Sequence, residues 1–299
     1  MRTNGTDVSE RASWTVEGVL DAGFDFSRRF LPETLAQVNA LDGLSGSEKH
    51  QLNQIRGLTY AHVLGLFEGL IIRESLSLAS RSPLDQPVER RALLRFAEEE
   101  SRHQILFERV KAGLLPSLGS CGLVAGAAAV AGVVVQKSEL CVLLLTVMLE
   151  MMTQHHFTHF FCASERREAL DPTFVKIFKS HGREEARHVK LGQLEIQRCA
   201  AAVGQDTCEA AVDELLEIAH AFDRLFDAQV DMDLESLERL AGRTLSDPVK
   251  RGVRATQHKA YRFTFLVSAL RNPKFRAMAG TLTESGARRL DAAAAALST

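Results

Sequence analysis

The sequence contains two copies of a five-residue motif, Glu-Glu-x-Arg-His, at residues 99–103 and 184–188. A single glutamate precedes each copy: thirty residues separate Glu68 from the first motif, and thirty-three separate Glu150 from the second. On a helix, Glu-x-x-His places a carboxylate and an imidazole about one turn apart on one face. Two such helices, with one inward glutamate from each of two others, form the ligand set of a dinuclear metal site in a four-helix bundle. These ligands suit iron or manganese better than a metal that prefers thiolates.

The spacing within each motif indicates which glutamates bind the metal. The second glutamate stands three residues before the histidine and shares its face most closely. The first glutamate, Glu99 or Glu184, is better placed to accept a hydrogen bond from a ligating imidazole or from the motif arginine. No catalytic residue is expected beyond the metal ligands. The six expected core ligands are Glu68, Glu100, His103, Glu150, Glu185 and His188.

Charged residues at helical spacing usually form a solvated surface, so one motif alone would not indicate a metal site. The second copy, with its matched upstream glutamate, argues against that interpretation. Glu150 is the most informative residue, because it follows the mainly apolar stretch 140–149 and precedes Met151 and Met152. A lone carboxylate in such surroundings is costly to bury unless it is paired or binds a metal.

His181 stands four residues before Glu185, about 40° away around the helix and on the same side. His181, Glu185 and His188 therefore place three donors on consecutive turns of one face, and we expect all three to bind the same metal. Phe96 occupies the corresponding position in the first half. The extra nitrogen donor predicts two chemically distinct metals.

Three further histidines, His155, His156 and His159, follow Glu150. The four-residue spacing of His155 and His159 is that of a zinc site. However, these two residues lie about 140° and 180° away from Glu150 around the helix. We therefore expect the three histidines to serve packing or to lie on the surface.

Apolar residues that recur with a period near 3.6, and only seven prolines, predict an almost entirely helical chain. The first half precedes the second by 82 residues at the upstream glutamates and by 85 at the motif histidines, so we expect two helix pairs related by a pseudo-twofold axis. Capping residues and prolines predict bundle helices that start near residues 46, 87, 139 and 172. We predict a single helical domain over residues 1–299, with lead-in helices at 8–41, a metal-binding bundle at about 46–203 and accessory helices at 205–297.

The composition is that of a soluble globular protein: 45% of the residues are hydrophobic, 25% are charged and the net charge is −2. This balance gives no reason to expect nucleic acid or an anionic membrane as a partner. The apolar stretches 123–135 and 140–149 are shorter than the roughly 20 residues of a membrane span, so no membrane segment is expected. Five cysteines without Cys-x-x-Cys spacing, and an N-terminus without a secretory signal, predict a cytoplasmic protein.

A glutamate followed after about thirty residues by (Asp/Glu)-Glu-x-Arg-His, twice, resembles the motif of the ferritin-like non-haem diiron oxygenases and oxidases. Glutamate stands at both leading positions here, a mild departure from that pattern. The additional His181 resembles the seven-ligand site of the p-aminobenzoate N-oxygenase (AurF-like) family, and residues 57–62 and 93–100 also look like that family. The resemblance covers roughly residues 50–200. It implies an all-α, ferritin-like four-helix bundle that carries a dinuclear site, with additional N- and C-terminal helices.

The resemblance also implies an oxidoreductase that uses dioxygen. Two iron ions, with manganese as the alternative, would be held by four terminal or bridging carboxylates and by His103, His181 and His188. N-oxygenation of an arylamine is the leading reaction. The expected partners are a small-molecule substrate, dioxygen and an electron donor, either a reductase or a small reductant.

Two alternative functions fit much of the same pattern. A diiron oxidase or hydroxylase that acts on carbon would use the same ligands except His181. A ferritin-like ferroxidase predicts a compact four-helix chain, whereas about ninety-five residues follow the last bundle helix here. These residues are expected to shape a substrate pocket or the interface of a homodimer.

Overall fold

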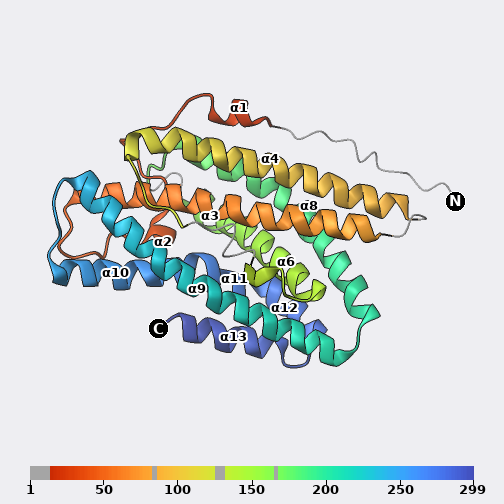
Figure 1. The fold of residues 1–299 in the computed structure, drawn as a ribbon. Helices are drawn as coiled ribbons and strands as arrows, with labels where there is room; N and C mark the ends of the chain where they lie inside the picture. The colour runs from red at the N-terminus through yellow and green to blue at the C-terminus, as the bar shows by residue number, and fades with distance from the viewer. Residues whose placement is uncertain (1–13, 83–85, 125–131, 165–167) are drawn as a thin grey trace.

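The computed structural model describes residues 14–82, 86–124, 132–164 and 168–299 of the chain (Figure 1). Helices make up most of these residues, and the described part of the chain contains no β-strand. The prediction of an all-α protein is confirmed.

Four long helices carry the predicted metal ligands (Figure 1). They are α3 (Gly46–Arg81), α4 (Pro87–Leu118), α6 (Glu139–His155) and α8 (Pro172–Ala202). α3 packs along α4, and α6 packs along α8. Each pair therefore joins one helix with an upstream glutamate to one helix with a motif, as the offset in the sequence predicted.

Side-chain caps fix the starts of three of these helices. The Ser45 hydroxyl accepts a hydrogen bond from the Glu48 N–H at 3.2 Å, and the Glu48 carboxylate accepts one from the Ser45 N–H at 2.7 Å, which forms a capping box. Ser138 caps α6 and Asp171 caps α8, each through the N–H three residues further on. The predicted starts of the four bundle helices are confirmed.

The segment before α3 differs from the predicted lead-in helices at 8–41. Its described part contains only the short helices α1 (Val16–Leu20) and α2 (Glu33–Ala36), and residues 8–13 lie outside the described residues. The buried Asn53 side chain on α3 replaces helical hydrogen bonds in this segment. Its carbonyl oxygen accepts from two consecutive backbone N–H groups, and its amide donates to a backbone carbonyl. Apolar periodicity does not reveal a segment that a distant side chain holds in place.

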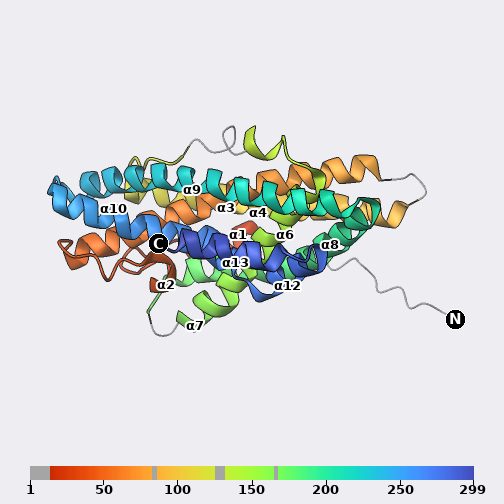
Figure 2. The same ribbon diagram turned by 90° about the horizontal axis from the view of Figure 1, so that it is seen from below.

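The C-terminal third places further helices against the bundle, on the side opposite α1 (Figures 1 and 2). The C-terminal elements are α9 (Gln205–Ala241), α10 (Asp247–Arg262), η2 (Phe263–Val267), α11 (Ser268–Leu270), α12 (Pro273–Leu282) and α13 (Gly286–Leu297). Both α3 and α6 contact α9. The π-helical turn η2 joins α10 to α11 without a break, and a second π-helical turn, η1 (His156–Phe161), extends α6 into α7 (Cys162–Ser164).

Two helical stretches, Gly46–Arg81 and Glu139–Ser164, are long and apolar enough to cross a membrane, as judged by length and composition alone. In the most apolar part of these stretches, 67% and 78% of the residues, respectively, are buried inside the fold. Core helices of soluble proteins show the same combination, so the two stretches are weak evidence for a membrane segment.

Glycines allow α6 and α8 to approach each other closely. A Cβ atom at Gly192 would overlap the side chain of Val147 on α6, and a Cβ atom at Gly182 would lie 2.8 Å from the Cβ of Phe157. A well-packed interior has no spare volume into which these neighbours could move freely. The helix that carries Glu150 therefore depends on the absence of two side chains on α8.

Gly192→Ala is expected to lower the free energy of unfolding by about 1–3 kcal/mol, because the added methyl group overpacks the contact between α6 and α8. Gly252→Ala on α10 is the matched control, because an added Cβ there has no atom within 4 Å. The higher helix propensity of alanine should raise stability at that position by roughly 0.5–1 kcal/mol. Urea unfolding of both variants measures the two effects, and a gain in stability from Gly192→Ala would contradict the expected overpacking.

Candidate metal centre

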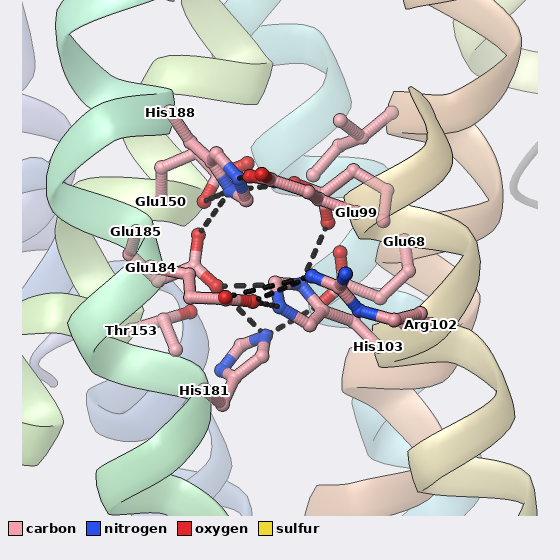
Figure 3. Close-up of polar contacts among 12 residues, drawn as sticks. Glu68, Glu99, Arg102, His103, Glu150, Thr153, His181, Glu184, Glu185 and His188 are labelled. Atoms are coloured by element: carbon pink, nitrogen blue, oxygen red, sulfur yellow. Dashed lines mark hydrogen bonds and ion pairs between the residues drawn. The ribbon is translucent and has the colours of Figure 1, made fainter. Parts of the chain in front are cut away.

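All seven predicted ligands meet in the interior, between the two helix pairs (Figure 3). In the close-up, side chains from α8 face side chains from α3 and α4 across a central space. Each of the seven side chains belongs to a residue that is at most 4% exposed. These residues are Glu68 on α3, Glu100 and His103 on α4, Glu150 on α6, and His181, Glu185 and His188 on α8.

One group of ligand atoms, which we call position 1, comes from Glu68, His103 and His181. One atom from each of these residues lies within 4.8 Å of the other two. His181 Nε2 is 2.9 Å from Glu68 Oε1. Position 1 therefore combines one carboxylate and two imidazoles from three different helices.

A second group, which we call position 2, comes from Glu100, Glu150, Glu185 and His188. Ligand atoms of all four residues lie within 4.8 Å of one another. Glu150 Oε2 is 3.7 Å from His188 Nδ1. Position 2 therefore combines three carboxylates with one imidazole.

Two carboxylates, Glu100 and Glu185, reach both positions. Glu100 Oε2 lies 3.0 Å from His103 Nδ1, while its Oε1 lies 2.6 Å from His188 Nδ1. Glu185 Oε1 lies 2.9 Å from His181 Nε2, while its Oε2 lies 3.1 Å from His188 Nδ1. Both carboxylates are thus placed to bridge two metal ions, whereas each upstream glutamate belongs to one position.

His181 lies inside the site, as its spacing predicted, but it does not share a position with His188. That these two histidines bind the same metal stays a prediction, and the grouping of the donor atoms favours separate positions for them. They stand seven residues apart on α8, which is roughly 10 Å along the helix axis. The sequence argument used the angle around the helix and neglected this axial separation. His181 instead joins His103, which comes from the opposite helix pair.

The hydrogen bonding of the carboxylates fits bound cations. Glu100 Oε1, Glu150 Oε1 and Glu185 Oε1 are all buried and have no hydrogen-bond partner. Glu100 Oε1 and Glu185 Oε1 lie 2.6 Å and 2.9 Å from imidazole nitrogens and can pair with them when the rings are protonated, whereas Glu150 Oε1 has no such contact with another described residue. Buried oxygens without partners are costly. A cation between the carboxylates would satisfy all three oxygens, so the residues present suit a dinuclear metal centre.

Two carboxylates outside these groups bind the motif histidines in a crossed arrangement. Glu184 Oε2 accepts a hydrogen bond from His103 Nε2 at 3.0 Å, and Glu99 Oε2 accepts one from His188 Nε2 at 2.8 Å. Each carboxylate thus contacts the histidine of the other motif. An ionised carboxylate only accepts, so it holds the proton on Nε2 and leaves Nδ1 directed at the candidate metal position. The spacing predicted this role for the two glutamates but not that they exchange partners.

The motif arginines hold these outer carboxylates in place. Arg102 Nη2 lies 3.2 Å from Glu184 Oε2, and Arg187 Nη2 lies 3.3 Å from Glu99 Oε2 and 3.4 Å from Glu184 Oε1. Burial works against ionisation of Glu99, but His188 and Arg187 nearby bring the pKa of its carboxyl group down to about 2. The outer glutamates are therefore ionised at neutral pH and can orient the imidazoles.

Burial and mutual proximity shift the pKa values of the inner residues in different directions. Burial raises the pKa of Glu68 well above its usual range, and the Glu100 carboxylate raises it further. Burial would lower the pKa of His103, but the same carboxylate raises it to about 10. Burial lowers the pKa of His181 to about 4, with a further contribution from His103. Metal ions need deprotonated ligands, so metal binding at this site must release protons.

Aromatic side chains surround the candidate ligands. The Trp14 ring stacks on His103 with 6.0 Å between ring centroids and 8° between the planes. Phe96, which occupies the place that corresponds to His181, packs against His188 at 4.6 Å. Thr153, one turn after Glu150, also lies beside the site (Figure 3). The helical period could have revealed Thr153, whereas no sequence signal connects Trp14 to a motif almost ninety residues away.

A hollow of about 510 Å³ lies between the N-terminal segment and α8. Trp14 lines it together with Lys179, Ser180 and Arg183, which neighbour the ligands of α8 in the sequence. Lys176 also lines the hollow and lies 3.3 Å from Asp21, so the lining carries three basic side chains. Trp14 therefore contacts a candidate ligand and also borders a positively charged hollow.

The histidines after Glu150 lie away from the candidate metal ligands, as predicted. His156 is buried and binds Tyr60 and Ser268. The rings of His155 and His159 stack on each other with their centroids 4.2 Å apart. Among the described residues, no group of potential metal ligands includes any of the three.

No protein-family model, no curated protein and no solved structure matches this chain. The geometry of the site and the motif in the sequence are thus the grounds for assigning a function.

Glu150→Ala is expected to abolish most metal binding, because it removes a buried carboxylate from position 2, and loss of the ion there leaves the shared Glu100 and Glu185 with less positive charge to hold them together. Elemental analysis of anaerobically iron-loaded protein should give about two irons per wild-type chain, as a dinuclear site requires. Glu98→Ala, which changes an exposed glutamate next to the first motif, is the matched control and should bind iron as the wild type does. Full iron content in Glu150→Ala would show that the ligands are assigned incorrectly.

Glu184→Gln should weaken metal binding at position 1 by roughly 10- to 100-fold, because the neutral amide orients and polarises His103 less effectively. Glu99→Gln should do the same at position 2, through His188. Titration with Mn²⁺ against a chelator, followed by magnetic resonance of the bound ions, measures the two affinities. If Glu184→Gln weakened position 2 and Glu99→Gln weakened position 1, the crossed arrangement would be incorrect.

Proposed function

We propose that the protein is a non-haem diiron oxygenase, an oxidoreductase that activates dioxygen at a carboxylate-bridged diiron centre and oxygenates the nitrogen of an amine. An arylamine is the leading class of substrate. The observation that carries the proposal is the set of seven buried donors, arranged as two positions that share Glu100 and Glu185. Two bound ferrous ions would supply electrons for the reduction of dioxygen.

The donor chemistry supports iron, with manganese as the alternative. Four carboxylates and three imidazoles are oxygen and nitrogen ligands of intermediate hardness, and none of the seven is a thiolate. Glu68, His103 and His181 would hold the ion at position 1. Glu150 and His188 would hold the ion at position 2. The remaining two glutamates would bridge the ions.

The unequal surroundings of the two positions support an oxygenase over an iron store. Position 1 has the additional nitrogen of His181, which would hold its ion firmly. At position 2 the corresponding place is taken by Phe96, which contacts the His188 ring and offers no ligand. An ion with fewer protein ligands has room for an exogenous molecule. The apolar surroundings would exclude water from the reacting molecules.

The alternatives are an oxidase or hydroxylase that acts on carbon, and a ferroxidase. The extra histidine donor favours nitrogen over carbon as the target, because the resemblance to the N-oxygenases depends on it. The C-terminal helices, which cover the bundle on one side, favour a substrate enzyme over a compact ferroxidase (Figure 1). We further propose an external electron donor, either a reductase or a small reductant, a cytoplasmic location and a homodimeric assembly.

The test is to mix the anaerobic diferrous protein with dioxygen and to follow its visible spectrum with and without a panel of aromatic amines. We expect a long-lived absorption that decays faster when an amine is present, with a hydroxylamine or nitro compound as the product. His181→Phe, which copies the residue of the first half, should lower the product yield at least roughly tenfold by loosening the ion at position 1.

His159→Phe is the matched control, because His159 is exposed and belongs to no ligand group. It should give the wild-type spectrum and yield. Rapid oxidation of many irons per chain, without product from any amine, would replace the oxygenase with a ferroxidase. Products oxygenated only at carbon would indicate the oxidase or hydroxylase that acts on carbon.

A further inference from the structure

A chain of buried hydrogen bonds runs through the core, separated from the candidate metal ligand His181 by two phenylalanine rings. The Tyr60 hydroxyl lies 2.9 Å from His156 Nδ1, and His156 Nε2 lies 2.8 Å from Ser268 Oγ. The exposed fractions of the three residues are 1%, 0% and 7%. The chain connects α3, η1 and α11, and neither the metal ligands nor the helix caps account for it.

The direction of these hydrogen bonds is fixed at one end. Ser268 Oγ donates its hydrogen to the carbonyl oxygen of Thr264 at 2.9 Å. It must therefore accept from His156 Nε2–H, which leaves His156 Nδ1 without a proton. Tyr60 then donates its hydroxyl hydrogen to Nδ1. Burial lowers the pKa of His156 to about 3, so the imidazole is neutral at physiological pH. A phenol thus donates to a neutral base inside the core.

Aromatic rings connect Tyr60 to the candidate metal ligands. The Tyr60 and Phe178 ring centroids are 5.0 Å apart, those of Phe178 and Phe107 are 5.9 Å apart, and those of Phe107 and His181 are 5.0 Å apart. Tyr60 also lies eight residues before Glu68 on the same helix, which is about 12 Å along the axis. An electron can move over such a distance through packed rings.

The other end of the chain reaches a hollow of about 160 Å³, which Ser268 lines together with His155 and Arg271. Both flanking segments are π-helical: η1 begins at His156, and η2 ends immediately before Ser268. Single π-helical turns are rare and occur often at functional sites. Here they place the imidazole and the hydroxyl in line with Tyr60.

The surroundings of the second tyrosine, Tyr261, differ from those of Tyr60 and do not favour oxidation of the ring. Tyr261 donates to the buried Asp233 carboxylate at 2.5 Å, and the Arg56 guanidinium carbon lies 3.3 Å from the centre of its ring. A cation against the ring opposes the loss of an electron from it. The Tyr60 ring instead contacts Phe178, Phe161 and Phe265, and the neutral His156.

We propose that Tyr60 is a redox-active residue that gives one electron to the oxygen-oxidised metal centre while its hydroxyl proton moves to His156 Nδ1. The O–H bond of Tyr60 breaks, an N–H bond forms on His156, the centre is reduced by one electron, and a neutral phenoxyl radical remains. The oxidant is the one that the proposed function supplies, so this inference rests on that function. The reaction would reduce the oxidised centre when dioxygen has reacted and no amine substrate is bound.

The first experiment uses metal-free protein and an external oxidant, so that its result does not depend on the proposed function. A photo-generated ruthenium(III) complex oxidises the protein in a Trp14→Phe background, and transient absorption records the phenoxyl radical. Tyr60→Phe should remove most of the signal, and the matched variant Tyr261→Phe should retain it. His156→Gln, whose amide is a far weaker base, should lower the yield at least roughly tenfold.

Ser268→Ala is a second variant that keeps both rings and should lower the yield by a smaller factor, because it removes only the far contact of His156. Circular dichroism and thermal unfolding confirm that each variant is folded. An unchanged signal in Tyr60→Phe, or in both His156→Gln and Ser268→Ala, would overturn the assignment of Tyr60 and His156 as a redox pair.

The second experiment mixes diferrous protein with dioxygen, without an amine, and traps the products for electron paramagnetic resonance. A phenoxyl signal in the wild type and in Tyr261→Phe, but not in Tyr60→Phe, supports the proposal. Oxidation of iron without any phenoxyl signal would overturn it, because Tyr60 would then not react with the centre. Failure of the iron to react with dioxygen would overturn the proposed function instead, and the photochemical result would still decide whether Tyr60 and His156 act together.

Discussion

The repulsion between four buried carboxylates is the constraint on which the rest of this structure depends. Carboxylates this close together cannot all be ionised in a dry interior unless positive charge lies between them. Imidazoles and protons provide that charge in the protein alone, and two divalent ions would provide it more completely. The long helices, their apolar outer contacts and the close approach of α6 to α8 all serve to keep these carboxylates together.

The two helix pairs meet this constraint together, because each pair provides a glutamate that binds the motif histidine of the other pair. Each motif provides a histidine that points into the site, and each histidine is oriented by a glutamate of the other motif. Neither pair could form its half of the site alone, so assembly of the site and docking of the pairs are the same event. The two halves of the site differ at one place: His181 stands four residues before Glu185, whereas Phe96 stands four residues before Glu100. This difference gives the two positions unequal surroundings.

Much of the bundle could be predicted from the sequence, because helix starts depend on local caps and inward residues follow the helical period. The seven side chains that meet in the interior were identified from the sequence for the same reason. The sequence said less about distance along the helix axis, because the angle around the helix alone placed His181 with His188, whereas the structure groups His181 with Glu68 and His103. Contacts between distant segments were equally hidden, as Trp14 against His103 shows. The prediction of helices in the N-terminal segment was wrong because local sequence does not show that Asn53, on a later helix, forms hydrogen bonds with the backbone of this segment.

The π-helical turn η2 also bears on how the parts of this chain could change independently. A π-helical turn corresponds to one residue more than a regular α-helix would need. The helix before η2 is tied to α9 through Tyr261 and Asp233, while the residue after it, Ser268, belongs to a different set of partners. Deletion of one residue within η2 would rotate everything downstream by about 100° relative to the upstream half. One residue of chain length therefore determines whether these two buried networks coexist on a single helix, while the candidate metal ligands stay unchanged.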